Sequence, residues 1–411
     1  MLLKFGELAL KGRNRPLFVN ALERNLRRLT ADLGPLEIRH RGGVFIVTGD
    51  VPQDALVERA LGLPGVSVVQ PALRCERDPA AAADAAVALL RDRPGRTFAI
   101  RTTRRDKSFP LRSVQLSRVI GEAVRVRLGL DVDLSKPDLA AYVEVDHREL
   151  LVSADRLRGA GGLPVGSSGR ALVLMSGGLD SPVAAYRMMK RGLRCDFVHF
   201  SGRPFTGPQS VYKAYALAGR LDRFQGDSRL FVVSFGGAQR RLATAGAGRL
   251  QVLSQRRLMV KVASLLGRRE GAEALVTGDS LGQVASQTLP NLAVVEEASE
   301  QPLLRPLIDR DKQEIVEIAK QLGTYDISIL PDEDCCQLFS TKLAVTCGQP
   351  DDLRQIERTA DIEELVDTLV ESAELHRPRL EAPAPALAGA RRGLSSGLRA
   401  PIAQPDRATP S

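Results

Sequence analysis

A chain of 411 residues is too long for one ordinary hydrophobic core, so we expect two or three domains. The hydrophobic fraction of 44% and the charged fraction of 26% are typical of globular proteins. No apolar run approaches the ~20 residues that a membrane-spanning helix needs, and Lys4, Glu7 and Lys11 interrupt any secretion signal at the start. We therefore expect a cytoplasmic protein without a membrane partner.

The net charge of +9 is distributed unevenly along the chain. Residues 1–170 carry 28 Lys and Arg against 20 Asp and Glu, a net charge of +8. Such a basic region is typical of proteins that bind a polyanion, but solvated arginines give the same signal, so charge alone leaves a nucleic-acid partner open. The five cysteines are an odd number without a secretion signal, so we expect free thiols and no disulfide framework.

The first half of the chain alternates in the manner of small α+β domains. Its periodicity predicts strands over 2–8, 36–48, 66–69, 97–102, 140–145 and 149–153, and helices over 16–33, 53–61, 80–90 and 111–128. Residues 159–170 contain so much glycine that we expect a linker or hinge there.

The second half changes to the pattern of a parallel sheet covered on both faces. Strands are predicted over 171–175, 194–200, 230–235 and 274–277, and helices over 182–191, 250–266 and 311–322. The first of these elements make a βαβ unit. After about residue 374 the composition loses its periodicity, and we expect a disordered tail.

The strongest motif is the run Ser176, Gly177, Gly178, Leu179, Asp180, Ser181, which lies between the apolar strand and the following helix. Alone it would indicate only a tight turn, but its flanking elements favour a phosphate loop. Two glycines let backbone N–H groups point into a concavity, and the helix N-terminus adds the positive end of its dipole. Asp180 suits Mg²⁺ better than an anion. The Gly-Lys-Ser/Thr ending of a Walker-type loop is missing, which indicates chemistry at an α-phosphate.

This loop resembles the Ser-Gly-Gly-x-Asp-Ser loop of the PP-loop pyrophosphatases, and the chain more closely resembles the tRNA 4-thiouridine synthetase (ThiI) family. The opening run over 5–12, Phe-Gly-Glu-Leu-Ala-Leu-Lys-Gly, resembles the family's first signature. Arg-Asp-Lys-Ser-Phe-Pro over 105–110 lies in a stretch that resembles the RNA-binding THUMP domain. The linker, the phosphate loop and the runs over 277–288 and 329–336 follow in the family's order.

The resemblance implies an α+β N-terminal region followed by a Rossmann-like α/β domain with a parallel sheet, of the adenine nucleotide alpha hydrolase type. The implied domains are a ferredoxin-like domain over 1–53, a THUMP domain over 54–158, the linker over 159–170, a PP-loop domain over 171–350, and a C-terminal helix with the tail over 351–411.

By the same resemblance, ATP and Mg²⁺ are the expected cofactors. The residues expected to bind the nucleotide are Leu174, Met175, Ser176, Gly177, Gly178, Ser181, His199, Phe200, Arg256, Gly278 and Gln287. Asp180 is expected to be catalytic and to face the metal ion. Taken singly, His199 and Phe200 could be sheet packing and Arg256 a solvated helix charge, but as a set they fit a nucleotide site beyond the carboxyl ends of parallel strands.

Cys335 and Cys336 lie in a segment without strong periodicity, where a side chain can be presented to a substrate. A thiolate can accept sulfur as a persulfide and deliver it to an electrophilic carbon. Three acidic neighbours disfavour the thiolate, and paired cysteines are more often packing. The resemblance nevertheless implies that Cys335 carries the sulfur, with Cys336 as the alternative. An iron–sulfur site that includes Cys347 is disfavoured because no fourth cysteine is nearby.

The resemblance implies that the protein adenylates a tRNA uridine at position 8 and replaces its oxygen with persulfide sulfur, giving 4-thiouridine. We expect tRNA and a cysteine desulfurase as partners, and a homodimer. A sulfur carrier protein is a further partner if the family's link to thiamine thiazole synthesis holds. Since no rhodanese-like domain is recognised after residue 350, we expect the chain's own cysteines to take the sulfur. The alternatives are another PP-loop adenylating enzyme with a small-molecule substrate and a non-catalytic RNA-binding protein.

Overall fold

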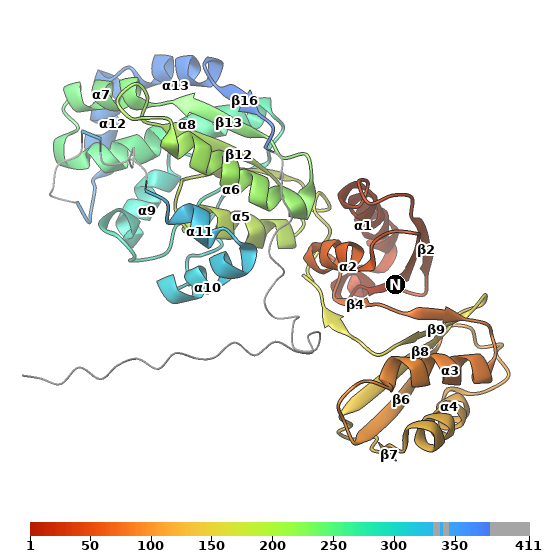
Figure 1. The fold of residues 1–411 in the computed structure, drawn as a ribbon. Coiled ribbons are helices and arrows are strands. Elements are labelled where there is room, and N and C mark those ends of the chain that lie inside the picture. Colours follow the sequence, from red (N-terminus) through yellow and green to blue (C-terminus); the bar gives the residue numbers. More distant parts are fainter. Residues whose placement is uncertain (332–337, 340–344, 379–411) are drawn as a thin grey trace, which may run out of the picture.

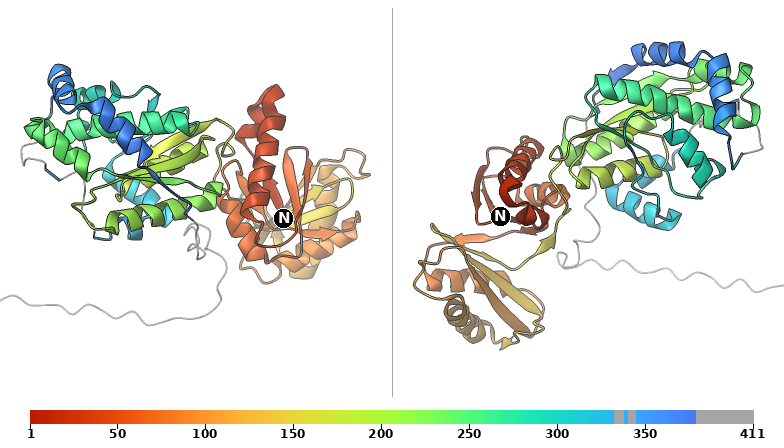
Figure 2. Two further views of the ribbon diagram at one scale, coloured as in Figure 1. Left: turned by 90° about the horizontal axis from the view of Figure 1, so that it is seen from above. Right: turned by 180° about the vertical axis from the view of Figure 1, so that it is seen from behind.

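The structure is a computed structural model that describes residues 1–331, 338–339 and 345–378. It contains three sheet-based domains, and Figure 1 shows the first domain lying between the other two. The right-hand view of Figure 2 shows the same order from behind. The predicted fold class, an α+β region followed by an α/β domain, is therefore confirmed. The disordered tail was expected after about residue 374, but residues 374–376 form a strand that pairs in the sheet of the third domain. Residues 379–411 lie outside the described residues.

The first domain is built on an antiparallel sheet with the strand order β10-β4-β1-β3-β2. Its elements are β1 (Leu2–Lys4), η1 (Glu7–Leu10), η2 (Gly12–Asn14), α1 (Arg15–Leu29), β2 (Glu37–Arg41), β3 (Val44–Thr48), α2 (Gln53–Gly62), β4 (Val68–Gln70) and β10 (Leu157–Arg158). Both β4 and β10 come after residue 53, where we expected the ferredoxin-like domain to end. The chain thus returns to the first sheet after it has formed the second domain.

The single strand predicted over 36–48 is wrong, because the structure has a hairpin there. Strands β2 and β3 pair antiparallel, with Arg41 opposite Val44. Gly42 and Gly43 form the turn with φ of +54° and +83°, a region that glycine reaches without steric cost. The Gly-Gly pair was the local sequence signal for this turn, and the prediction of one continuous strand did not use it.

The second domain is a mixed sheet with the order β5-β9-β8-β6-β7 and two helices packed against it. Its elements are β5 (Leu73–Cys75), α3 (Pro79–Leu90), β6 (Thr97–Arg104), α4 (Ser113–Leu128), β7 (Asp131–Val132), β8 (Leu139–Val145) and β9 (Leu150–Ser153). Helix α3 begins at a proline whose predecessor, Asp78, accepts a hydrogen bond from the backbone N–H of Ala81. This domain has its own buried hydrophobic core beneath α3 and α4, separate from the cores of the third domain.

The third domain is a six-stranded sheet with the order β15-β14-β11-β12-β13-β16. Its strands are β11 (Arg170–Leu174), β12 (Arg194–Ser201), β13 (Leu230–Ser234), β14 (Ala274–Val276), β15 (Leu303–Leu304) and β16 (Glu374–His376). Its helices are α5 (Asp180–Lys190), α6 (Gln209–Gln225), α7 (Gly236–Thr244), η3 (Gly248–Leu250), α8 (Gln251–Arg269), η4 (Ala285–Gln287), α9 (Leu289–Glu296), α10 (Lys312–Leu322), α11 (Tyr325–Ser328), α12 (Pro350–Thr359) and α13 (Ile362–Glu371). All neighbouring strands are parallel except β16, which pairs antiparallel with β13.

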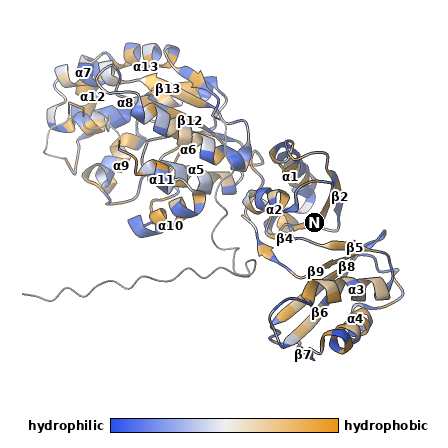
Figure 3. Cartoon of the chain, viewed as in Figure 1, coloured by the Kyte–Doolittle hydropathy of each residue, from blue (hydrophilic) through white to orange (hydrophobic). Residues whose placement is uncertain are grey.

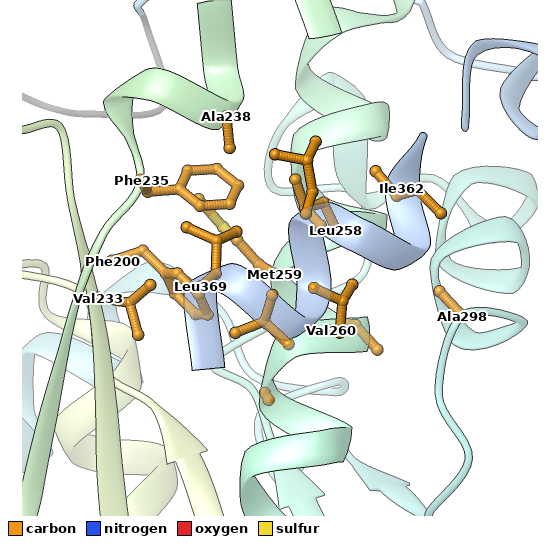
Figure 4. Packing of buried hydrophobic residues seen from close by; sticks show 14 of the residues in the cluster. Phe200, Val233, Phe235, Ala238, Leu258, Met259, Val260, Ala298, Ile362 and Leu369 are labelled. Atoms are coloured by element: carbon orange, nitrogen blue, oxygen red, sulfur yellow. The ribbon is translucent and has the colours of Figure 1, made fainter. Parts of the chain in front are cut away.

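Helices cover both faces of this third sheet. Helices α5, α6 and α10 pack on one face, and α7, α8, α9, α12 and α13 pack on the other. Figure 4 shows Leu369 of α13 beside Phe200 of β12, and Leu258 of α8 lies in the same core. Strand β13 is coloured as hydrophobic in Figure 3, as expected for a strand buried on both faces. This layering leaves the carboxyl ends of the parallel strands at one edge, where open α/β sheets bind ligands.

The glycine-rich residues 159–170 join the first and third domains, but they are not a loose tether. On the first-domain side, the N–H of Gly161 donates to the carbonyl of Val66 at 2.7 Å. On the other side, the N–H of Leu163 donates to the carbonyl of Lys190 at 2.9 Å. The linker therefore fastens the first domain to the end of α5.

Candidate active site

The Ser-Gly-Gly-Leu-Asp-Ser loop lies between β11 and α5, at the carboxyl edge of the third sheet. The loop is closed by Ser181, whose Oγ accepts the N–H of Ser176 at 3.0 Å and lies 3.1 Å from the Ser176 Oγ. The Ser176 Oγ in turn accepts the N–H of Gly178 at 3.2 Å. Ser181 is buried, whereas Ser176 and Gly178 are exposed. An exposed backbone turn at a helix N-terminus is an arrangement suited to an anion.

A second loop, over residues 277–288, follows β14 and packs against this phosphate loop. A Cβ atom at Gly278 would lie 2.8 Å from the backbone N of Ser181 and 2.9 Å from the backbone C of Asp180. Backbone atoms cannot rotate out of the way, so the position requires glycine. The structure thus brings Gly278 and the phosphate loop, both predicted from the sequence, into direct contact.

The carboxylate of Asp180 is held by two residues that the sequence analysis did not single out. The Lys312 Nζ lies 2.8 Å from Oδ1, and the Gln283 Nε2 donates to Oδ2 at 3.1 Å. Lys312 is the first residue of α10, and its local sequence reads as an ordinary helix start. Nothing in that context distinguishes it from a solvated lysine. In this place its ammonium group can pair with a phosphate oxygen as well as with the carboxylate.

Asp279 ties two predicted residues together, although it was not itself predicted as a site residue. Its Oδ1 accepts from Arg256 and, at 3.3 Å, from the Gln287 Nε2. Its Oδ2 accepts the Thr277 hydroxyl at 2.7 Å and lies 3.4 Å from the Arg305 Nε. Burial raises the pKa of Asp279, but the charge of Arg256 and these hydrogen bonds outweigh burial, so the pKa lies below its usual value. Its position three residues after the end of β14 was the one signal for this role in the sequence.

The other residues predicted for the nucleotide lie behind and beside the phosphate loop. His199 is buried, with Nδ1 2.9 Å from the carbonyl of Met175 and Nε2 3.2 Å from the Ser210 Oγ. It therefore supports the backbone at the point where the loop begins. Phe200 is buried in the core of Figure 4, and Leu174 packs against the same core.

The cysteines divide into buried, exposed and undescribed ones. Cys335 and Cys336, the predicted sulfur carriers, lie outside the described residues. Burial raises the pKa of the Cys195 thiol well above its usual range, and burial with nearby acids raises that of Cys75 to about 11. Both shifts disfavour the reactive thiolate at Cys195 and Cys75, whereas Cys347 is exposed.

The described residues on either side of the two predicted sulfur carriers are anchored close to the phosphate loop. Before them, the Ser328 hydroxyl donates to the carbonyl of Gly178 at 3.2 Å. After them, the Gln255 Nε2 of α8 donates to the carbonyl of Leu338 at 3.1 Å. Both flanks therefore lie at the carboxyl edge of the third sheet.

The part of the chain that the structure describes holds no group of three or more His, Cys, Asp or Glu side chains suited to a metal ion. Asp180 is the carboxylate at the phosphate loop, and a single carboxylate beside nucleotide phosphates is an ordinary arrangement for Mg²⁺. No described helix combines the length and the apolar character that crossing a membrane requires.

Family models match a segment of each of the three domains. A model described as thiamine biosynthesis protein (ThiI) matches residues 166–362, a THUMP domain model matches 80–155, and a ThiI ferredoxin-like domain model matches 1–69. A protein of Nocardia farcinica named probable tRNA sulfurtransferase is 53% identical over 384 residues, which are 92% of each chain. One of the same name from Geobacillus thermodenitrificans is 38% identical over 378 residues, 91% of this chain and 94% of the relative.

Solved structures extend the likeness to three dimensions. The crystal structure of a 4-thiouridine synthetase in complex with RNA and bound ATP has a TM-score of 0.84 and 31% identity, covering 91% of this chain and 98% of that one. PH1313 from Pyrococcus horikoshii has a TM-score of 0.63 at 22% identity and covers 78% of this chain, which shows a shared fold alone.

Proposed function

Because this chain belongs to the ThiI family of tRNA sulfurtransferases, we propose that it transfers sulfur to a tRNA uridine and makes 4-thiouridine. Its ferredoxin-like and THUMP domains precede a PP-loop domain, and the protein is a sulfurtransferase enzyme. The observation that carries the proposal is the packing of Gly278 onto the phosphate loop beside the Asp180–Lys312 pair. This packing brings together Gly278 and Asp180, two predicted residues from distant segments, which supports a single anion site.

We assign the ATP phosphates to the loop over 176–181. The backbone N–H groups at the start of α5 and the Ser176 hydroxyl donate to the phosphate oxygens. Lys312 balances the negative charge that develops on the departing pyrophosphate. Mg²⁺, when bound at Asp180, neutralises phosphate charge as a Lewis acid. The uridine O4 then attacks the α-phosphorus, pyrophosphate leaves, and the adenylated base is a better electrophile than uracil.

The sulfur step is assigned to Cys335, with Cys336 as the alternative. The outer sulfur of a persulfide on this residue forms a bond to C4 of the base as AMP leaves. A thiol then cleaves the S–S bond, so each turnover consumes a reductant. The described flanks at Ser328 and Leu338 support this assignment, since both are hydrogen-bonded at the carboxyl edge of the sheet.

The proposal includes specific partners. The basic N-terminal domains hold the tRNA backbone, and the target is the uridine at position 8. A cysteine desulfurase supplies the persulfide, and a sulfur carrier protein is the acceptor in a second, thiamine-related reaction. We further propose that the enzyme is a homodimer and acts in the cytoplasm.

The experiment is mass spectrometry of nucleosides from tRNA incubated with the protein, ATP, Mg²⁺, a cysteine desulfurase, cysteine and a thiol reductant. Cys335→Ser and Cys336→Ser variants are run in parallel, with Cys75→Ser as the control because a raised pKa disfavours the Cys75 thiolate. We expect 4-thiouridine from the wild type and the control, and none from Cys335→Ser. Cleavage of ATP to AMP without any thiolated base would contradict the tRNA substrate and favour a small-molecule acceptor.

A further inference from the structure

Two exposed aromatic rings lie beside the candidate active site. Phe205 and Phe339 are 41% and 42% exposed, and their ring centroids are 5.3 Å apart with the planes at 86°. The guanidinium carbon of Arg240 lies 5.6 Å from the centroid of the Phe205 ring. None of these three side chains belongs to the phosphate loop or to the Asp279 network. A large exposed aromatic pair with a cation over it is unusual unless it meets a ligand.

The backbone beneath the pair is closely packed. Phe205 follows the end of β12, and Gly236 begins α7 directly after β13. A Cβ atom at Gly236 would lie 2.4 Å from the carbonyl oxygen of Gly202 and 2.9 Å from the Phe205 ring, so the position requires glycine. The N–H of Gly236 donates to the carbonyl of Arg203 at 3.0 Å. Phe205 is therefore set rigidly at the carboxyl edge of β12 and β13.

The second ring is held in an unfavourable backbone conformation. Phe339 has a φ of +60°, in the left-handed region that bulky residues rarely adopt. Its neighbour Leu338 is fixed by the hydrogen bond from Gln255 at 3.1 Å. Strain of this kind is typical of functional positions, where the surrounding structure imposes it. Here the strained residue is an exposed phenylalanine beside Phe205, so it does not serve to fill the core.

We propose that Phe205, Phe339 and Arg240 form a platform on which the target base of the tRNA stacks during the reaction. This inference rests on the proposed function, since it requires an RNA substrate. A base that undergoes chemistry must leave its stack in the RNA, and proteins hold such bases on aromatic rings and arginine planes. The platform supplies both kinds of surface and lies at the same sheet edge as the phosphate loop.

The observations favour an RNA base over the adenine of ATP as the occupant. The residues assigned to the nucleotide, including Met175 and His199, lie at the end of β11 and within β12, whereas Phe205 lies four residues beyond β12 and packs against α7. Arg240 adds a positive charge that suits the phosphates flanking an extruded nucleotide. The platform is thus next to the nucleotide residues but built from other elements.

The test compares Phe205→Leu, which keeps apolar volume but removes the ring, with Phe205→Tyr, which keeps the ring. At saturating ATP and tRNA, and without any sulfur donor, we expect tRNA-dependent pyrophosphate release to fall roughly 10- to 100-fold in Phe205→Leu. The tyrosine variant should stay within about threefold of the wild type, because stacking is retained. Tyr215→Leu, which removes another exposed aromatic ring, is the control and should leave the rate unchanged.

A second measurement reports stacking directly and does not need turnover. A tRNA with 2-aminopurine at position 8 should stay quenched on binding the wild type and the tyrosine variant, because the base passes from one stack to another. On binding Phe205→Leu its fluorescence should rise, because the unstacked base finds no ring. Equal losses of rate in both Phe205 variants would overturn the platform and indicate a packing role. A raised KM for ATP would identify adenine as the occupant instead. A defect confined to reactions with the desulfurase would assign the surface to that protein. Quenching without 4-thiouridine formation would leave the platform standing and contradict the proposed function.

Discussion

The Nζ atom of Lys312 lies 2.8 Å from Oδ1 of Asp180, and this contact joins the first residue of α10 to the first residue of α5. The lysine side chain is 49% exposed, so the pair contributes only about 0–1 kcal/mol to stability. Under the proposed function, the pair acts in phosphate binding. A cation at the N-terminus of α5 adds to the positive end of the helix dipole beside the phosphate loop.

Lys312→Met removes the cation and keeps most of the side-chain length. We expect tRNA-dependent pyrophosphate release to fall by about 100-fold or more, because charge on the leaving group is no longer balanced. The melting temperature should change little, since the pair is exposed. Initial rates and thermal melting are the measurements, and Lys320→Met on the same helix is the control. A Lys312→Met enzyme with wild-type rates would show that Lys312 is only a surface partner of Asp180.

Gly162→Ala should detach the first domain from the third. Gly162 has a φ of +74°, and a Cβ atom there would lie 2.1 Å from the carbonyl oxygen of Lys190. The neighbouring Gly161 has a φ of +69° but no atom within 4 Å of its added Cβ, so Gly161→Ala carries the backbone strain without the clash. We expect faster proteolysis between the domains and at least a tenfold loss of 4-thiouridine formation only in Gly162→Ala. ATP binding should remain in both variants.

That pair of variants also tests whether the linker is rigid. If both variants are cleaved equally fast, the left-handed backbone and not the contact with Lys190 holds the domains together. Small-angle scattering of the two variants distinguishes a detached first domain from local damage to α5. Equal scattering by both variants and the wild type would contradict the docking role of Gly162.

Elements that depend on local sequence could be predicted. The helix predicted over 311–322 is present as α10. Asp311 caps it by accepting the N–H of Glu314 at 2.9 Å, and Gly323 ends it at a φ of +66°. The phosphate loop has the expected strand before it and helix after it, because both flanks carry strong apolar patterns. The resemblance to the ThiI family supplied the order of the domains.

The features that the sequence could not reveal are contacts between distant segments. Lys312 and Asp180 are 132 positions apart, and no local pattern connects them. The role of Asp279 likewise depends on Arg256 and Gln287 meeting it in space. The glycines of the linker predicted a flexible segment, yet Gly162 is required because the backbone of Lys190 lies too close for a side chain. Composition alone does not distinguish a glycine in a flexible segment from a glycine at a close contact.

The ion pair between the buried Asp279 and the partly buried Arg256 makes the stability of the fold depend on pH. The pKa of Asp279 is lowered in the folded protein from its ordinary value of 3.8, so the ionised form stabilises the fold. This contribution is fully present above about pH 5 and is lost as the pH falls through the folded-state pKa. Asp279→Asn should therefore flatten the decrease of the urea midpoint between about pH 5 and pH 3.

Arg256→Met should lower the free energy of unfolding by about 3 kcal/mol near pH 7, because the Asp279 carboxylate, in a residue that is 4% exposed, loses an ionic partner. The loss should be smaller near pH 4, where the Asp279 carboxylate is protonated more easily. Urea unfolding of the three proteins at several pH values is the measurement. Parallel pH profiles for the wild type and Asp279→Asn would show that other carboxylates control the acid stability of this domain.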